Sequence, residues 1–220
     1  MLKHFPDHSH LDCVDEVRRK ATVLPVGVDL RRLDAVPEGG RRDGPPVVLW
    51  NQRWEYDKDP ETFFRALYAL AKEGVCFRVV ISGQSHRQTA PEFNAAREKL
   101  GDRVVHFGYA EEDTYAELLR RADIVVSTAI HEFFGVAVVE ATYSGCFPVL
   151  PNRLSYPELI PKGHHDVCLY EGFEELLARL RWALTHPEMA RRIAGDLRPA
   201  MRRFDWAEIG PVYDRVLASI

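Results

Sequence analysis

The sequence predicts an α/β fold, a doubly wound parallel sheet with helices on both faces and further helices at the C-terminal end. From residue 47 onwards, short apolar runs of strand length alternate about five times with longer segments of helical periodicity, a pattern typical of a parallel sheet. The strand-length runs are continuously apolar rather than alternating, as expected when both faces of the sheet are covered. The 220 residues are enough for one domain with extensions.

The elements follow one another at regular spacing. A short helix is expected at Leu11–Lys20, and residues 37–46 form a loop because glycine and proline gather there. The expected strands are Val47–Asn51, Cys76–Ser82, Val104–Phe107, Asp123–Ser127, Phe147–Leu150 and Val167–Tyr170. The expected helices, identified by apolar residues at helical spacing, are Pro60–Glu73, Glu92–Leu100, Thr114–Arg121, Gly135–Ser144, Phe173–Thr185, Pro187–Arg203 and Trp206–Ala218.

Composition excludes several classes of protein. Lys and Arg number 29 against 33 Asp and Glu, which gives a net charge of −4 and argues against a protein built around a nucleic-acid or membrane surface. No apolar run approaches ~18 residues, so no membrane-spanning helix is expected. Three of the four cysteines have apolar neighbours and are predicted to be buried free thiols, which suits the cytoplasm. These three are Cys76, Cys146 and Cys168, and the fourth is Cys13.

The loop after the first strand carries two cations five residues apart, Arg53 and Lys58. Ligands of parallel sheets bind beyond the carboxyl ends of the strands, so chemistry is expected in such loops. An arginine fork and a lysine point charge together could clamp a diphosphate. The alternative is a surface arginine and lysine paired with the acidic residues of the same loop, which are Glu55, Asp57 and Asp59. The Asp-x-Asp spacing is too short a pattern to indicate a metal site.

The loop after the fourth strand leads through Glu132 and Gly135 into a helix that contains Glu140. Gly135 lets the backbone approach a ligand closely, and a helix N-terminus attracts phosphate. Glu132 could accept hydrogen bonds from sugar hydroxyls. Glu140 has apolar neighbours, so its carboxylate needs a partner, either ribose hydroxyls or an internal arginine. The alternative is a helix-capping Glu132 and a salt-bridged Glu140.

These loops carry motifs of a known family. Glu132 and Glu140 form a Glu-x7-Glu motif, Arg53 and Lys58 have Arg-x4-Lys spacing, and 25–29 read P-x-G-V-D. Together they resemble the donor-binding, C-terminal, Rossmann-like half of a GT-B glycosyltransferase of the large retaining family four. The longer segments 49–61 and 127–137 narrow the resemblance to the tRNA-queuosine mannosyltransferase-like group, and the likeness extends from about Pro25 to Ile220.

The resemblance implies roles for the charged residues. Arg53 and Lys58 would neutralise the diphosphate of a nucleotide-sugar donor, Glu132 would hold the sugar hydroxyls, and Glu140 would hold the ribose hydroxyls. Of these, Glu132, Arg53 and Lys58 are the expected catalytic residues. In the family's chemistry the sugar is transferred with retention and without a required metal, and the donor implied here is GDP-mannose or a similar nucleotide sugar. Stabilising the departing nucleoside diphosphate would be the physical core of the reaction.

The remaining donor-binding residues are implied through their backbones or their place in the fold. Gly135 and its neighbours Phe134 and Val136 would cradle the distal phosphate. Gly83 would lie near the donor, and Tyr109 would border the base. One departure is Gln52, which stands where the family has a glycine before the diphosphate-binding arginine, so the close backbone approach expected at that point is in question.

The resemblance also predicts the organisation of the chain. Residues 1–46 would be an N-terminal linker or extension, 47–203 the Rossmann-like nucleotide-sugar-binding domain, and 204–220 a C-terminal crossover helix. His4, His8 and His10 are interpreted as part of a polar segment of the linker rather than as metal ligands. A GT-B enzyme also has an acceptor-binding N-terminal half, which the resemblance does not place in this sequence, so that half is an expected partner, in the same or a separate chain. Queuosine-bearing tRNA is the expected acceptor.

Two other functions fit the same residues. The chain could be a non-catalytic nucleotide-binding or partner-docking module, or, less in keeping with the motifs, a sugar-nucleotide epimerase of the same fold. Transfer of sugar to an acceptor, rather than isomerised sugar nucleotide, would argue against the epimerase.

Overall fold

The computed structural model describes residues 12–35, 44–84 and 91–219, and every structural statement below concerns these ranges. The three N-terminal histidines and most of the expected loop at 37–46 lie outside the described residues. Within them, no helix is both long enough and apolar enough to cross a membrane.

The core of the molecule is a six-stranded sheet in the order β3-β2-β1-β4-β5-β6, with every neighbouring pair parallel. Strand order reverses between β1 and β4, because the chain builds outward from β1 on one side and from β4 on the other. This confirms the predicted doubly wound α/β sheet. The strands are β1 (Val47–Trp50), β2 (Arg78–Ser82), β3 (Val104–Gly108), β4 (Ile124–Val126), β5 (Phe147–Pro151) and β6 (Leu169–Tyr170).

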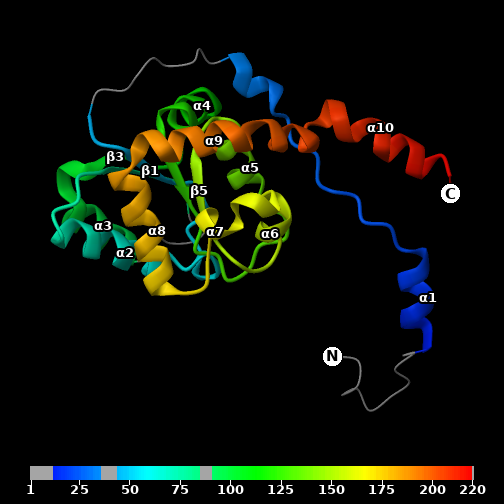
Figure 1. Cartoon of the computed structure of the whole chain (residues 1–220), viewed down its shortest axis with the longest axis horizontal. Helices are drawn as coiled ribbons and strands as arrows, with labels where there is room; N and C mark the ends of the chain where they lie inside the picture. Colours follow the sequence, from blue (N-terminus) through cyan, green and yellow to red (C-terminus); the bar gives the residue numbers. More distant parts are fainter. Residues whose placement is uncertain (1–11, 36–43, 85–90, 220) are drawn as a thin grey trace.

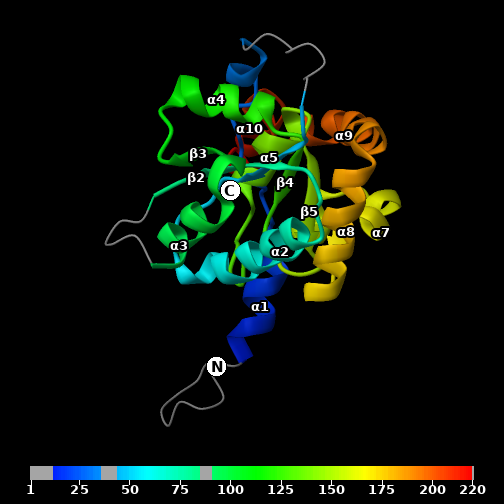
Figure 2. The same ribbon diagram turned by 90° about the vertical axis from the view of Figure 1, so that its left-hand side faces the viewer.

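Helices cover both faces of this sheet (Figure 2). On one face α2 packs against α3 and α8, and on the other α5 packs against α4 and α9. The helices of the first face are α2 (Pro60–Lys72), α3 (Pro91–Leu100) and α8 (Phe173–Thr185); those of the second are α4 (Glu112–Arg121), α5 (Val136–Tyr143) and α9 (Pro187–Met201). The strands β1 and β4 are buried almost throughout, which explains their continuously apolar sequence.

Several short helical turns were not indicated by the sequence pattern. They are η2 (Arg31–Ala35), η3 (Tyr56–Lys58), η4 (Gly101–Arg103), α6 (Tyr156–Leu159), η5 (Lys162–His164) and α7 (His165–Cys168), whereas η6 (Arg202–Phe204) overlaps the end of the helix expected at Pro187–Arg203. One of them corrects the strand expected at Val167–Tyr170, whose first two residues belong to α7. The His165 ring forms hydrogen bonds with the carbonyls of Pro157 (3.1 Å) and Ile160 (2.8 Å), which hold this turn in place.

The cysteine prediction is right for two of its three residues. Cys146 and Cys168 are buried and free, but Cys76 is exposed. Cys76 lies in the turn between α2 and β2, where the next residue, Phe77, takes the core position with 1% of its surface exposed. Cys13, on the N-terminal helix α1 (Asp12–Lys20), is exposed too.

The segment before β1 returns to the far end of the chain. Val28 N–H donates to Phe204 O (2.8 Å), and Trp206 N–H donates to Val28 O (3.1 Å). Leu30 N–H donates to the Asp205 carboxylate (3.2 Å), which also caps the C-terminal helix α10 (Trp206–Leu217). Figure 1 shows this segment crossing at the junction of α9 and α10, while α1 stands apart from the sheet.

Candidate functional site

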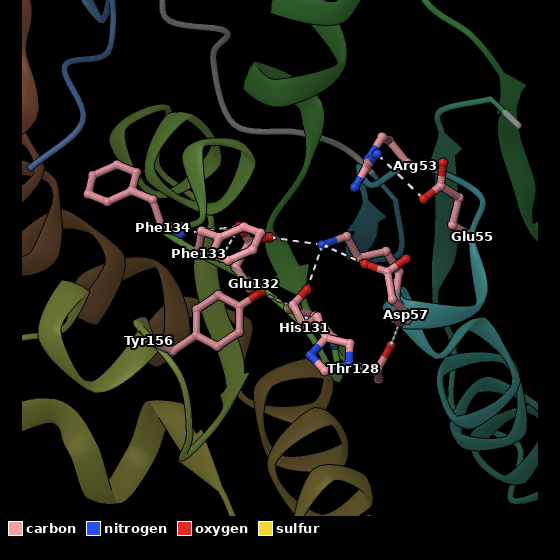
Figure 3. A network of polar contacts seen from close by, with 12 residues as sticks. Arg53, Glu55, Asp57, Thr128, His131, Glu132, Phe133, Phe134 and Tyr156 are labelled. Carbon is pink, nitrogen blue, oxygen red and sulfur yellow. Dashed lines mark hydrogen bonds and ion pairs between the residues drawn. The ribbon is translucent and has the colours of Figure 1, made fainter. Parts of the chain in front are cut away.

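Two loops join at the point where strand order reverses, one after β1 and one after β4. Thr128 Oγ1 donates to the carbonyls of Lys58 (2.7 Å) and Asp59 (2.9 Å), and Ile130 N–H donates to Asp57 O (2.7 Å). These bonds fasten the β4 loop to the β1 loop (Figure 3). The reversal of strand order is where open α/β sheets bind their ligands.

Lys58 is the charged centre of the joined loops. Its Nζ donates to His131 O (2.8 Å) and Glu132 Oε2 (3.2 Å) and lies 3.4 Å from Asp57 Oδ2. An ammonium has three N–H donors; two of those of Lys58 are used in hydrogen bonds to His131 and Glu132, and the contact with Asp57 is an ion pair. With only 6% of its surface exposed, Lys58 is not the surface cation of the alternative interpretation, although its pairing with Asp57 agrees with it.

The side chains of two other charged residues of the β1 loop, Arg53 and Asp59, have partners within a few residues in sequence, whereas that of Lys58 also reaches the β4 loop. Arg53 is exposed, and its Nη1 lies 3.4 Å from Glu55 Oε2, as the charge pattern of the loop suggested. Asp59 pairs with neither cation. Its side chain accepts the Thr62 N–H (3.2 Å) and caps α2. The described residues contain no group of three or more His, Cys, Asp or Glu side chains placed to hold a metal ion.

Glu132 lies before α5 without capping it. Its Oε1 accepts from the backbone N–H groups of Phe133 (3.0 Å) and Phe134 (3.3 Å) within its own loop, so the helix-capping alternative is wrong. The N-cap position belongs to Gly135, with a φ of +99° and no side chain to cap the helix. A Cβ at Gly135 would lie 3.1 Å from Leu159 Cδ1 and 3.3 Å from the Tyr156 ring. The N-terminus of α5 therefore offers uncapped N–H groups and positive dipole charge.

Glu140 is a buried carboxylate with two side-chain partners. Arg32, from η2, donates to Oε1 (2.5 Å), and the Tyr115 hydroxyl, from α4, donates to Oε2 (2.9 Å). Asn51 in turn donates to the Tyr115 oxygen (2.9 Å) and to Ala137 O (2.9 Å). The salt bridge predicted for Glu140 as an alternative is confirmed. Burial, reinforced by the Glu140 charge, raises the pKa of Tyr115 well above its ordinary value, so this hydroxyl keeps its proton and donates.

A cavity of about 450 Å³ opens beside these loops, at the carboxyl ends of β1, β2 and β3. Its lining residues are Arg32, Asn51, Gln52, Arg53, Ser82, Gly83, Gln84, Tyr109, Ala110, Glu112 and Tyr115. A Cβ at Gly83 would lie 2.1 Å from the Gln52 carbonyl oxygen. The Gln52 and Gly83 backbones therefore approach closely because Gly83 has no side chain.

The structure divides the residues singled out in the sequence into two groups. Arg53, Gly83 and Tyr109 line the cavity. Glu140 belongs with them because it is hydrogen-bonded to two other lining residues, Arg32 and Tyr115. The other group lies in the joined loops and at the start of α5, and consists of Lys58, Glu132, Phe134, Gly135 and Val136. The Phe134 ring points away from Glu132 (Figure 3). It packs edge-on against Phe204, with ring centroids 5.1 Å apart.

Arg32, Asn51, Tyr115 and Thr128 were missed in the sequence. Arg32 follows another arginine in a polar segment, and Tyr115 stands in an ordinary amphipathic helix. No local spacing links either of them to Glu140, which lies 108 and 25 residues away. Asn51, at the end of the first expected strand, and Thr128, inside the second unusual loop, did have a positional signal.

Comparison with known proteins identifies the domain. The family model described as glycosyl transferases group 1 matches residues 33–196, from η2 into α9. The chain belongs to the glycosyl transferases group 1 family. The match includes β1 to β6, both loops and all the cavity-lining residues except Arg32.

Relatives of this group 1 domain include glycosyltransferases of several specificities. It is 46% identical over 115 residues to a tRNA-queuosine alpha-mannosyltransferase of Drosophila melanogaster, covering 52% of this chain and 30% of the relative. It is 28% identical over 176 residues to a GDP-mannose-dependent alpha-(1-6)-phosphatidylinositol dimannoside mannosyltransferase of Mycobacterium tuberculosis, covering 77% of this chain and 45% of the relative. The matched region is thus less than half of either curated relative.

Solved structures agree with the fold. Anabaena HepE in complex with UDP superposes with a TM-score of 0.73 at 18% identity, covering 100% of this chain and 70% of that one. At this identity the likeness establishes the fold alone: the group 1 domain has the Rossmann-like architecture of GT-B glycosyltransferases.

Proposed function

We propose that this group 1 domain binds a nucleotide-sugar donor and forms the donor half of a retaining hexosyltransferase. The observation that carries the proposal is the reversal of strand order between β1 and β4. The cavity with the exposed Arg53, at the ends of β1 to β3, and the uncapped start of α5, after β4, lie on the same edge of the parallel sheet. A nucleoside would occupy the cavity, with its diphosphate directed to Arg53 and to the N–H groups near Gly135.

In this arrangement the charged residues act on the leaving group. Negative charge develops on the nucleoside diphosphate as its bond to the sugar breaks, and positive groups fixed beforehand lower the barrier. Arg53 would donate as a fork to phosphate oxygens, and α5 would contribute its dipole. Glu132, held by Lys58 and two backbone N–H groups, would orient the sugar hydroxyls.

Lys58 already has an anionic ion-pair partner in Asp57, with which a donor phosphate would compete. Its longest contact is the one to Asp57, at 3.4 Å. We propose that a donor phosphate oxygen takes the place of Asp57, while the bonds to His131 O and Glu132 persist. Lys58 would then connect the diphosphate with the residue that orients the sugar.

The finer identity of donor and acceptor rests on the relatives. Mannose from GDP-mannose is the proposed sugar because two of the relatives are named as mannosyltransferases, one of them GDP-mannose-dependent. Queuosine in tRNA is the proposed acceptor from the Drosophila relative, and a cytoplasmic location would follow from it. The acceptor would bind mainly to a second GT-B half, in this chain's continuation or in a partner, since the matched region covers less than half of either relative.

The proposal is tested by calorimetric titration of the chain with GDP, UDP and GDP-mannose. Saturable binding of GDP and GDP-mannose in preference to UDP is expected. A folded chain that binds none of the three would contradict the donor-binding assignment. Incubation of GDP-mannose with an acceptor then separates the activities: a mannosylated acceptor supports the transferase, isomerised sugar nucleotide supports an epimerase, and binding without either product supports a non-catalytic module.

Substitution of Lys58 and Glu140 tests the assigned residues. Lys58→Met and Glu140→Gln each remove one charge at nearly constant size, and each is expected to weaken GDP binding about tenfold or more, since hydrogen bonds to charged groups contribute roughly 1.5–3 kcal/mol. Lys72→Met and Glu117→Gln, at exposed positions of α2 and α4, are the matched controls and should bind GDP as the unaltered chain does. Normal binding by both site variants would refute these roles.

A further inference from the structure

The carboxylate of Glu140 is held from two directions by parts of the chain that are distant in sequence. Its neighbours Val139 and Ala141 are fully buried, and 7% of Glu140 itself is exposed. A carboxylate so placed is costly unless it is paired. Arg32 supplies the pairing on Oε1, and Tyr115 donates to Oε2.

Arg32 is fixed in place by the backbone around it. The flanking leucines, Leu30 and Leu33, are buried at 0% and 1% exposure. Arg120 donates to the Leu33 carbonyl (2.6 Å), and Leu30 N–H is bound by the Asp205 carboxylate. The Arg32 guanidinium also lies 3.5 Å from Glu112 on α4. The segment before β1 therefore presents this guanidinium from a rigid support.

Tyr115 is oriented equally firmly. Asn51 directs its amide nitrogen to the Ala137 carbonyl, so the same nitrogen is the donor to the Tyr115 oxygen. The Tyr115 proton is thereby committed to Glu140. Arg32, Asn51 and Tyr115 all line the cavity, so this network forms part of its wall.

We infer that Arg32 and Tyr115 are positioning residues for ribose recognition, an inference that rests on the proposed function. A carboxylate offers about four lone-pair sites, and Glu140 uses two of them for these donors. Arg32 and Tyr115 fix the carboxylate plane so that the two remaining sites accept the ribose 2′- and 3′-hydroxyls. The preference of the domain for a ribonucleotide over its 2′-deoxy form therefore depends on a residue that precedes the sheet.

The test compares GDP with 2′-deoxy-GDP by calorimetry on the same chain. The unaltered chain is expected to prefer GDP by roughly tenfold, the discrimination given by one hydrogen bond to a charged acceptor. Arg32→Ala should reduce this preference to about twofold or less. Tyr115→Phe, which removes a single oxygen, should also reduce it and serves if Arg32→Ala fails to fold. Arg31→Ala is the matched control, because Arg31 is exposed and faces Asp205 instead.

The possible results point to different conclusions. A full ribose preference in both Arg32→Ala and Tyr115→Phe would overturn the inference, and so would a folded variant that loses affinity for both nucleotides by the same factor. An unaltered chain that binds GDP and 2′-deoxy-GDP equally would also overturn it while leaving donor binding intact. An unaltered chain that binds neither nucleotide would refute the proposed function itself.

Discussion

Gly83 shows how much a single residue determines at the mouth of the cavity. It follows β2 with a φ of +149°, and its N–H donates to the carbonyl of Gly108, the last residue of β3 (3.0 Å). The Gln52 carbonyl and the Trp54 indole occupy the space where a side chain would stand. The carboxyl ends of β1, β2 and β3 thus meet at a point that only glycine accommodates.

Gly83→Ala is expected to lower the free energy of unfolding by about 2–3 kcal/mol, since both the backbone conformation and the contact with Gln52 are then strained. Gly74→Ala is the control. Gly74 also has a positive φ, +79°, but no atom lies within 4 Å of its added Cβ, so only the conformational cost of about 1 kcal/mol applies. Urea unfolding of both variants measures the difference, and equal losses would show that the close approach is easily relieved.

For individual residues, the sequence identified candidate site residues but not the side chains that they contact in the fold. Arg53, Lys58 and Glu132 were found because the ends of apolar runs can be recognised in a sequence, and Glu140 because a carboxylate among apolar neighbours stands out. Arg32 could not be found, because its meeting with Glu140 is made by packing between elements 108 residues apart. A buried carboxylate shows that a partner is needed but does not show which residue it is.

Among the elements, α2 depends on a cap that also forms part of the candidate site. Asp59 caps this helix from a left-handed conformation, with a φ of 46°. Its backbone carbonyl accepts the Thr128 hydroxyl of the neighbouring loop. The cap residue Asp59 therefore also fixes the position of Lys58, which directly precedes it in the chain.

Asp59→Ala is expected to lower the free energy of unfolding by about 1–2 kcal/mol, because the Thr62 N–H loses its acceptor and alanine tolerates a positive φ poorly. It should also weaken GDP binding, since Lys58 is adjacent. Asp59→Asn keeps an acceptor oxygen and tolerates this conformation, so its unfolding free energy should change by less than about 0.5 kcal/mol. Urea denaturation and GDP titration of the pair provide the check, and an alanine variant as stable as the asparagine variant would exclude the cap as a source of stability.

The order and type of the long elements were predictable, whereas short turns were not. Apolar runs and helical periodicity marked the strands and the main helices to within a few residues. The turns η2 and α6 have too few residues for a period to be recognised, and their positions are set by tertiary contacts. The strand predicted at Val167–Tyr170 was wrong in its first half for the same reason. The hydrogen bonds of the His165 ring, which hold the turn α7, leave no trace in the pattern of apolar residues.

For the whole molecule, burial of a thiol makes stability depend on pH. Burial raises the pKa of Cys168 from 9.0 to about 12. Below pH 9 the thiol is neutral in both the folded and unfolded chains, so its contribution is fully present. Between pH 9 and 12 the unfolded chain releases a proton that the folded chain keeps, so this contribution is lost as the pH rises.

The unaltered chain should therefore lose up to about 1.4 kcal/mol of unfolding free energy per pH unit above 9 on account of this thiol. Cys168→Ala removes the titrating group, and the fall between pH 8 and pH 10 should be smaller by about that amount. Cys13→Ala, at an exposed cysteine, should follow the unaltered chain. Urea unfolding at the two pH values measures each slope, and identical slopes in all three proteins would contradict the assignment.

The β-bridge between Val28 and Asp205 places the two ends of the folded domain next to each other. Everything from η2 to η6 lies between these two residues, so the chain enters and leaves the folded unit at one place. Domains with adjacent ends tolerate circular permutation. A gene in which a short linker joins the two ends, and new termini are cut in an exposed turn such as the one at Gly74, should therefore encode the same sheet with its strands in a different chain order.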